Sequence, residues 1–304
     1  MCLAFLILAH RLPSQVARLF DALHHEEDTF ILHFDRRAPR SLHELGRRLA
    51  RTHANVRLLP ARRIVWGGPV MGEVQVEAMA AALAADRRWT HFLNLTGQDF
   101  PLKSRDEMLA RFNAAPEKSY LSWFDPLDSG GLWRNARERL TRYHLAWPWL
   151  RQLLSVPGLG RRMGRVLGWK NQTPWIPGFT RRWPDFFRYY GGANHVALSR
   201  EAARYLVEDP RARRIRRWLR AAGHPDEILF QSALLNSPLA STLVNETLRE
   251  IDFPRHSPHP RTFTSGDLPR LLESPALLAR KFDARTDAGV LDRLEARIHP
   301  TLQS

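Results

Sequence analysis

Residues 1–34 read MCLAFLILAHRLPSQVARLFDALHHEEDTFILHF and hold the clearest structural pattern of the chain. The apolar run at 1–9 predicts a buried strand, and the apolar run at 30–34 predicts another. Between them, apolar residues recur with helical spacing at 16–23, behind Pro13, which the first turn of a helix tolerates. This strand–helix–strand order predicts the start of a parallel sheet.

The same alternation continues beyond residue 34. Helical spacing follows apolar extended runs as far as about residue 95, and regular patterns return after about residue 195. The predicted elements are helices at 42–49, 71–83, 200–207 and 228–235, extended segments at 56–59, 91–95 and 196–198, and partly helical structure over 268–298. Repeated cycles of this kind predict an α/β fold in which helices cover a mostly parallel central sheet.

The composition limits the class of protein. The chain has 304 residues, of which 44% are hydrophobic, so it can bury a large core. We expect a single domain over residues 1–304, with an irregular insertion rich in Trp and Arg at about 120–190. Cys2 is the only cysteine, which excludes a disulfide scaffold and any zinc or iron–sulfur site built on cysteines.

The charge of the chain is strongly positive. It has 46 Lys and Arg against 31 Asp and Glu, a formal charge of +15, which suits nucleotide diphosphates, nucleic acid or an anionic membrane. The basic stretches at 161–165 and 211–220 are suited to nucleic acid or anionic lipid, although the second is typical of a helix with a solvated face. No nucleic-acid-binding motif frames either stretch, so we expect no specific nucleic-acid partner.

The apolar run at 1–9 is also the candidate for a targeting or membrane segment. It is shorter than the roughly 20 apolar residues that a transmembrane helix needs. It has no basic region in front of it either, so we expect neither a signal peptide nor a transmembrane helix.

Polar residues follow two of the predicted strands. Asp35 comes directly after the strand at 30–34, and the strand at 91–95 runs into the loop Gly97-Gln98-Asp99. Ligands of open α/β sheets bind beyond the carboxyl ends of the strands, which makes both places candidate binding sites. Ordinary turns and caps also favour these residue types, so both interpretations stay open.

Two adjacent carboxylates stand in the string His224-Pro225-Asp226-Glu227, directly before an apolar helix. Acidic residues are typical of the first turn of a helix, where the macrodipole stabilises them. A carboxylate that faces a cleft can instead act as a general base. The residues alone leave both interpretations open.

Arg280 and Lys281 stand side by side near the end of the chain, and Arg261 belongs to the same basic region. Adjacent Arg and Lys can neutralise a phosphate group, although most such pairs are merely solvated. The sequence contains neither an Asp-x-Asp pair nor a His-Glu-x-x-His motif. Diphosphate chemistry would therefore depend on protein cations, and we expect no metal and no cofactor.

Seven strings follow one another along the chain: FLILAHR at 5–11, ILHFD at 31–35, VWGG at 65–68, FLNLTGQDFPLKS at 92–104, HPDE at 224–227, GDL at 266–268 and ARKFD at 279–283. In this order they resemble the core-2/I-branching glycosyltransferases, a family that includes the peptide O-xylosyltransferases. The resemblance implies a GT-A-like, Rossmann-type nucleotide-sugar transferase fold. It also implies inverting transfer from a UDP-sugar without a metal ion.

The resemblance assigns roles to single residues. Glu227 matches the catalytic base, and Lys281 matches a contact to the nucleotide diphosphate. A second cation at the diphosphate falls on Arg261 or Arg280. The strings that form the donor side supply Asp35, Trp66, Gly97 and Asp99.

The acceptor side departs from the family pattern. A Gly-Ser-x-aromatic string of the family reads Gly192-Ala193-Asn194-His195 here, so His195 stands in place of an aromatic residue. Arg142 and Asp226 are further expected acceptor contacts. The cysteines and the membrane anchor of secreted animal members are missing, which implies a bacterial-type, cytoplasmic enzyme. Such an enzyme can rest on the inner membrane through its arginines.

The leading hypothesis is a metal-independent inverting glycosyltransferase, with N-acetylglucosamine favoured as the sugar on UDP. The acceptor would be a glycan, a lipid-linked glycan or a polypeptide. An alternative is a peptide or protein O-xylosyltransferase that uses UDP-xylose. A non-catalytic carbohydrate- or RNA-binding module is the alternative from a different class, and the presence of both Glu227 and Lys281 argues against it.

Overall fold

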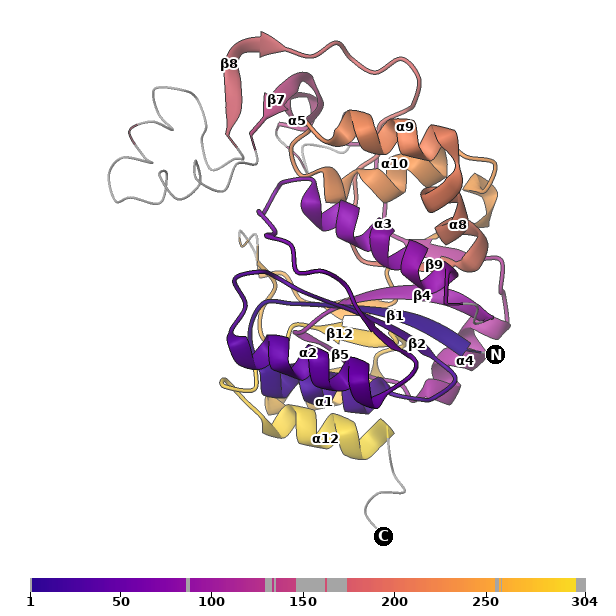
Figure 1. Cartoon of the computed structure of the whole chain (residues 1–304), viewed down its shortest axis with the longest axis vertical. Coiled ribbons are helices and arrows are strands. Elements are labelled where there is room, and N and C mark those ends of the chain that lie inside the picture. The colour runs from indigo at the N-terminus through magenta and orange to yellow at the C-terminus, as the bar shows by residue number, and fades with distance from the viewer. Residues whose placement is uncertain are drawn as a thin grey trace.

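The computed structural model describes residues 2–85, 88–128, 135–145, 174–254 and 259–298, with the single residues 133, 162 and 257. A seven-stranded sheet lies in the middle of the molecule, with helices on both faces (Figure 1). In spatial order its strands are β10 (Leu243–Asn245), β6 (Ser119–Leu121), β9 (Val196–Ser199), β4 (Trp89–Thr96), β1 (Cys2–Ala9), β2 (Thr29–Phe34) and β3 (Val56–Leu58). In this sheet β9 is antiparallel to β4 and β6, and the other neighbouring pairs are parallel. The predicted α/β fold with a mostly parallel central sheet is confirmed.

The central strand β1 shows why this sequence forms the sheet. All eight of its residues are buried, because β2 and β4 flank it and helices cover both faces. Its side chains alternate, so that Phe5 and Ile7 enter one core while Leu6 enters the other. Burial of each such side chain contributes roughly 2 kcal/mol, which explains a continuous apolar run at this position.

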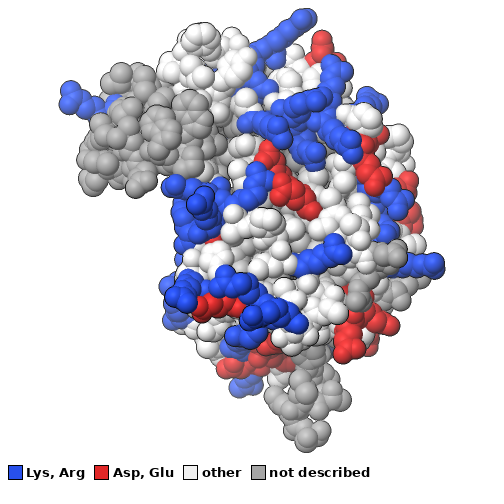
Figure 2. All heavy atoms as spheres, viewed as in Figure 1, with Lys and Arg blue, Asp and Glu red and all other residues white. Residues whose placement is uncertain are grey.

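The two cores hold different helices. The core around Phe5 is covered by α1 (Pro13–Leu23), α2 (Arg40–Thr52), α4 (Arg105–Asn113), α11 (Leu268–Glu273) and α12 (Gly289–Ile298). The core around Leu6 is covered by α3 (Val70–Leu83), α5 (Ala136–Thr141), α8 (Arg200–Glu208), α9 (Pro210–Leu219) and α10 (Leu229–Leu235). Figure 1 shows α1, α2 and α12 below the sheet and α3, α8, α9 and α10 above it. Lys and Arg side chains are spread over much of the face in this view (Figure 2).

Two smaller sheets position other segments. β11 (Arg249–Ile251), β12 (Leu278–Arg280) and β5 (Asp99–Pro101) form the first, in which Arg280 pairs in register with Asp99. β7 (Arg142–His144) and β8 (Trp175–Thr180) form the second, an antiparallel pair that we call the β7–β8 ribbon. Three single turns of 3₁₀ helix complete the described elements: η1 (Pro225–Glu227), η2 (Ala240–Thr242) and η3 (Ser265–Asp267).

The predicted helix at 228–235 differs from the observed one at its start. The helix α10 begins at Leu229, and Asp226 and Glu227 lie on η1, a separate turn before it. The two acids therefore lie in the turn η1, immediately before α10, and not in the first turn of α10 itself.

Within the expected insertion at 120–190, residues 129–132, 134, 146–161 and 163–173 lie outside the described residues, and with them the basic stretch at 161–165 apart from Arg162. The described parts of that range contribute β6, α5, β7 and β8. In the part of the chain that the structure describes, no helix combines the length and the apolar character needed to cross a bilayer.

Candidate active site

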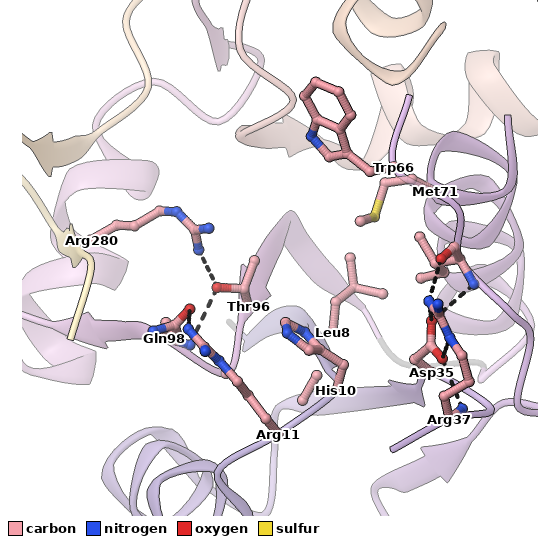
Figure 3. Close-up of a pocket in the computed structure, with 13 residues that line it drawn as sticks. Leu8, His10, Arg11, Asp35, Arg37, Trp66, Met71, Thr96, Gln98 and Arg280 are labelled. Carbon is pink, nitrogen blue, oxygen red and sulfur yellow. Dashed lines mark hydrogen bonds and ion pairs between the residues drawn. The ribbon is translucent and has the colours of Figure 1, made fainter. Parts of the chain in front are cut away.

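A cavity of about 340 Å³ lies at the carboxyl ends of the central parallel strands. Residues at or just beyond the ends of β1, β2 and β4 form its floor, as the rule for open α/β sheets predicts. Figure 3 shows the main lining side chains, with Arg280 and Gln98 on one side and Asp35 and Arg37 on the other. The full lining is Leu8, Ala9, His10, Arg11, Asp35, Arg37, Ile64, Trp66, Met71, Thr96, Gly97, Gln98 and Arg280.

Asp35 holds two other residues of the cavity wall in place. Its two oxygens accept four hydrogen bonds, from the backbone N–H, Nε and Nη2 of Arg37 and from the backbone N–H of Ile64, at 2.8–3.0 Å. Burial alone would raise the pKa of Asp35, but these bonds hold it at about 2. Because four bonds fill the acceptor positions of a carboxylate, Asp35 shapes the wall and has no free position for a ligand donor.

Arg280 reaches the opposite wall from the end of β12. Its Nη1 donates to Thr96 Oγ1 and to Asp99 Oδ1, the latter at 2.9 Å (Figure 3 shows the bond to Thr96). Asp99 is completely buried behind the wall. Burial would raise its pKa, but Arg280, His195 and Arg249 hold it below the ordinary value. Asp99 therefore acts as the fixed counter-ion of Arg280, whose other N–H groups stay available to a ligand.

The polar side of the cavity is held in place by side-chain bonds between distant segments. Arg11 Nη2 donates to Gln98 Oε1 at 2.9 Å, and Gln98 Nε2 donates to the carbonyl oxygen of Phe282 at 3.1 Å. Gln15 Nε2 also donates to the carbonyl oxygens of Gly97 and Phe282. Of the three arginines in the lining, Arg37 pairs with Asp35 and Arg280 pairs with the buried Asp99. The lining and its counter-ions thus keep one positive charge, which favours an anionic ligand.

The loop at 65–68 connects the cavity to the acidic turn η1. Trp66 lines the cavity with 55% of its surface exposed, and its ring lies edge-on against His224 with centroids 4.3 Å apart. The backbone N–H of His224 donates to the carbonyl oxygen of Gly67 at 3.1 Å. These contacts place the turn that carries Asp226 and Glu227 beside the Trp66 end of the cavity.

The two acids of η1 have different surroundings. Glu227 keeps about a third of its side chain exposed (34%), and its Oε2 accepts a bond from Arg139 Nη1 at 2.7 Å. Asp226 accepts from Asn194 Nδ2 at 2.9 Å, and burial followed by the charge of Glu227 raises its pKa to about 7. Glu227 is therefore the accessible carboxylate of the pair, and Asp226 is the enclosed one.

Arg139 is the partner of Glu227 that the sequence interpretation missed. Its guanidinium lies 3.7 Å from the ring centroid of Trp133, and its carbonyl oxygen accepts from the backbone N–H of Gly223 at 2.8 Å. Arg142, the expected acceptor contact, lies one turn further along the chain and pairs with Glu138 at 3.1 Å. No pattern in the sequence separates the two arginines, because the pairing with Glu227 spans 88 residues.

The comparisons with known proteins agree with the strings read from the sequence. Residues 3–273 match the family model described as Core-2/I-Branching enzyme. The chain belongs to this family.

Curated relatives carry the name xylosyltransferase. Xylosyltransferase 2 of Canis lupus familiaris is 25% identical over 98% of this chain and 34% of that protein. Xylosyltransferase 1 of the same species is 24% identical over 96% of this chain and 30% of that protein. The chain thus spans about a third of the length of these relatives.

Among solved structures, mouse xyloside xylosyltransferase 1 in its apo form is similar over most of both chains. It covers 91% of this chain and 96% of that one, with 10% sequence identity and a TM-score of 0.37. A similarity this low carries no information about the site.

The structure of this Core-2/I-branching chain brings together some of the residues expected at the site. Asp35, Trp66, Gly97 and Arg280 line one cavity. Lys281 follows Arg280 in the chain, is half-buried and is not part of the lining. Its role at a diphosphate remains a prediction.

Arg261 and His195 lie in other surroundings. Arg261 binds Asp267 at 2.7 Å and Asp252 at 2.9 Å, and these hydrogen bonds raise its pKa above the ordinary value. Two carboxylates thus already occupy Arg261, and Arg280 is the better placed second cation. Burial and then the charges of Arg249 and Arg280 lower the pKa of His195 to about 3, so His195 lies near these two arginines.

Several cavity residues had no role assigned from the sequence. His10 and Arg11 stand inside a string that carries the family resemblance, so membership of that string was the available signal. Gln98 belongs to the loop that was already expected at a binding site. Arg37 is two residues beyond Asp35, which is the spacing of a local side-chain pair rather than of a binding motif. Burial, followed by the charge of Arg11, lowers the pKa of His10.

Within the described ranges, no three His, Cys, Asp or Glu side chains come together in a group that could hold a metal ion.

Proposed function

We propose that this chain transfers a sugar from a UDP-sugar to an acceptor hydroxyl, with inversion at the anomeric carbon and without a metal ion. Membership of the Core-2/I-branching family supports glycosyl transfer as the activity. The observation that carries the finer proposal is the basic cavity at the strand ends, with Glu227 beside its Trp66 end.

The cavity suits a nucleoside diphosphate by its distribution of charge. The apolar wall at Ile64 and Met71 offers a surface for the nucleobase of the donor. Asp35 and Arg37 hold this wall in place. Arg280 and Arg11 on the polar side offer N–H donors for the diphosphate. Lys281 is the next residue after Arg280, and its charge would add to theirs.

Glu227 is the proposed general base. In an inverting transfer it takes the proton from the acceptor hydroxyl while that oxygen forms a bond to the anomeric carbon. The bond from the anomeric carbon to the diphosphate oxygen breaks on the opposite side, and UDP leaves with both bonding electrons. Arg280 and Lys281 stabilise the charge that develops on the leaving diphosphate. Arg139 keeps the Glu227 carboxylate in one orientation.

The identity of the donor sugar is the most specific part of the proposal. The family resemblance favours N-acetylglucosamine, whereas the relatives are named xylosyltransferases. We therefore place UDP-xylose beside UDP-N-acetylglucosamine as the two donors to compare first. The acceptor remains a glycan, lipid-linked glycan or polypeptide hydroxyl.

The test is UDP release by the purified chain from both donors, in excess chelator, with the Glu227→Gln and Asp226→Asn variants beside the wild type. Transfer to water or to an added acceptor should survive the chelator. The Glu227→Gln change should reduce it by a factor of about 100 or more, since general bases contribute on this scale. Turnover that needs a divalent cation, or that persists in Glu227→Gln, would refute the mechanism.

A further inference from the structure

The helix α9 presents an arginine-rich outer face. Its buried residues Ala212, Ile215 and Leu219 recur at helical spacing and fix the inward face. The exposed positions carry Arg211, Arg213, Arg214 and Arg217, with Arg220 as the C-cap. Figure 2 shows Lys and Arg gathered over α9 on this side of the molecule.

Most of this charge is not neutralised by nearby carboxylates. Arg220 Nε pairs with Glu73 at 2.9 Å. For Arg211, Arg213, Arg214 and Arg217, the described residues provide no ion-pair partner. The side chain of Arg214 lies 4.1 Å from the ring centroid of Phe186, a contact that leaves its charge uncompensated. The face therefore keeps a concentrated positive potential.

The β7–β8 ribbon adds exposed aromatic residues beside this face. Phe179 is 65% exposed and Tyr143 is 41% exposed. Arg181 joins the ribbon to α9, since its guanidinium lies 3.6 Å from the ring centroid of Trp218 and donates to the carbonyl oxygen of Trp218. The backbone N–H of His144 also donates to the carbonyl oxygen of Ala221 at 2.9 Å. The aromatic ribbon thus packs against the C-terminal end of the helix that carries the arginine face.

We infer that this surface, formed by α9 and the β7–β8 ribbon, docks on an anionic lipid bilayer. Arginines attract anionic headgroups, and an exposed phenylalanine gains by entering the boundary between headgroups and acyl chains. A soluble polyanion would use the arginines alone and would leave Phe179 in water. The combination of unpaired arginines with an exposed, wholly apolar ring therefore favours a bilayer.

The surface adjoins the proposed catalytic base. Arg139, which binds Glu227, lies on α5, and α5 leads directly into β7. Docking through the ribbon would hold Glu227 close to the bilayer, where a lipid-linked acceptor presents its hydroxyl. The inference about docking does not depend on this consequence, nor on the proposed transferase activity.

The experiment is co-sedimentation of the whole chain with phosphatidylcholine vesicles, with and without phosphatidylglycerol. We expect binding only to the vesicles that contain phosphatidylglycerol, and weaker binding as salt is raised. An absence of binding to these vesicles at low salt would overturn the inference.

A matched pair of triple variants separates the surface from the net charge. The first changes Arg211, Arg213 and Arg217 to Gln, and the control changes the exposed Arg47, Arg48 and Arg51 of α2 to Gln. Both remove three positive charges from one helix, and Figure 1 places α2 and α9 on opposite sides of the sheet. The α9 variant should bind the vesicles about tenfold more weakly or worse, while the control changes binding by less than about twofold. Equal losses in both variants would contradict a docking surface at α9.

Phe179→Ser separates a bilayer from a soluble polyanion, with heparin as the second probe. The change should weaken vesicle binding and leave heparin binding unaltered, because no charge is lost. If Phe179→Ser leaves vesicle binding unchanged, the surface recognises polyanions in general and the inference of a bilayer is wrong. Thermal unfolding of each variant checks that the fold is retained.

Discussion

Arg139 holds the carboxylate of Glu227, the proposed base. Replacing it by Ala removes the 2.7 Å bond to Glu227 and the contact with Trp133. We expect kcat to fall by about 10- to 100-fold, because small displacements of a catalytic group are costly, with the donor KM little changed. Steady-state kinetics of Arg139→Ala beside Arg142→Ala measures this directly. A larger loss in Arg142→Ala would favour the contact implied by the family resemblance.

The buried His91 should make the stability of the fold depend on pH. Its ring is fully buried, stacks on Phe112, and has Nε2 2.8 Å from the carbonyl oxygen of Lys118. Burial lowers its pKa to about 4. Because the unfolded chain binds the proton more tightly, His91 leaves stability intact above about pH 6.5 and reduces it as the pH falls toward 4.

His91→Phe should therefore make the fold less sensitive to acid. Between pH 7 and pH 5, the loss of unfolding free energy should shrink by about 2 kcal/mol relative to the wild type. Urea unfolding at the two pH values measures the difference, with the exposed His25→Phe as the control. An unchanged pH dependence in His91→Phe would show that His91 does not stay neutral in the fold.

For single residues, the sequence predicted site positions where they stand in short strings that resemble the family. Trp66, Gly97 and Arg280 could be chosen because each stands in a string that the family resemblance covers. Arg139 could not, because its role arises from a contact between distant segments. Whether an arginine serves a ligand or a carboxylate, as for Arg261, is likewise decided by tertiary neighbours.

Among the elements, the turn η1 depends on a close approach at Gly192. The backbone N–H of Gly192 donates to the carbonyl oxygen of Glu227 at 2.9 Å. A Cβ at this glycine would lie 2.0 Å from the carbonyl oxygen of Ser122 and 2.8 Å from Gln231 Nε2. The chain can therefore hold η1 in place here only without a side chain at position 192.

Gly192→Ala should thus damage both stability and activity. We expect it to lower the free energy of unfolding by about 1–3 kcal/mol, the usual cost of overpacking, and to displace Glu227. Gly72→Ala is a matched control on α3, where the nearest atom, Leu229 Cδ2, would be 3.4 Å away. Thermal melts and UDP release compare the two variants. Equal melting temperatures and equal rates of UDP release in the two variants would mean that the close approach at Gly192 does not limit stability or activity.

The elements themselves were predictable to different degrees. The strands β1, β2 and β4 and the helices α1 to α3 carry long apolar patterns, because each buries a continuous face. The strands β5, β11 and β12 have three residues each, which is too short for a period to appear. This small sheet nevertheless sets Arg280 beside Asp99, so part of the site lay beyond pattern analysis.

In the whole molecule, the basic cavity and the carboxylate of Glu227 are supplied by different parts of the fold. The ends of the central strands form the basic cavity, and the layer of helices above the sheet holds Glu227 on η1 next to Trp66. Two groups of arginines lie in different parts of the molecule, one lining the cavity and one on the outer face of α9. The sign of the net charge was evident from composition, whereas the position of these two groups depends on the tertiary fold.

We propose that the cavity binds the UDP part of the donor, whereas Glu227 acts on the acceptor. Titration calorimetry of UDP, in excess chelator, tests it on the wild type, Arg280→Gln and Glu227→Gln. We expect binding by the wild type, the same affinity in Glu227→Gln, and at least about tenfold weaker binding in Arg280→Gln, because a charge-assisted hydrogen bond is lost. Absence of UDP binding in the wild type, or unchanged affinity in Arg280→Gln, would contradict it.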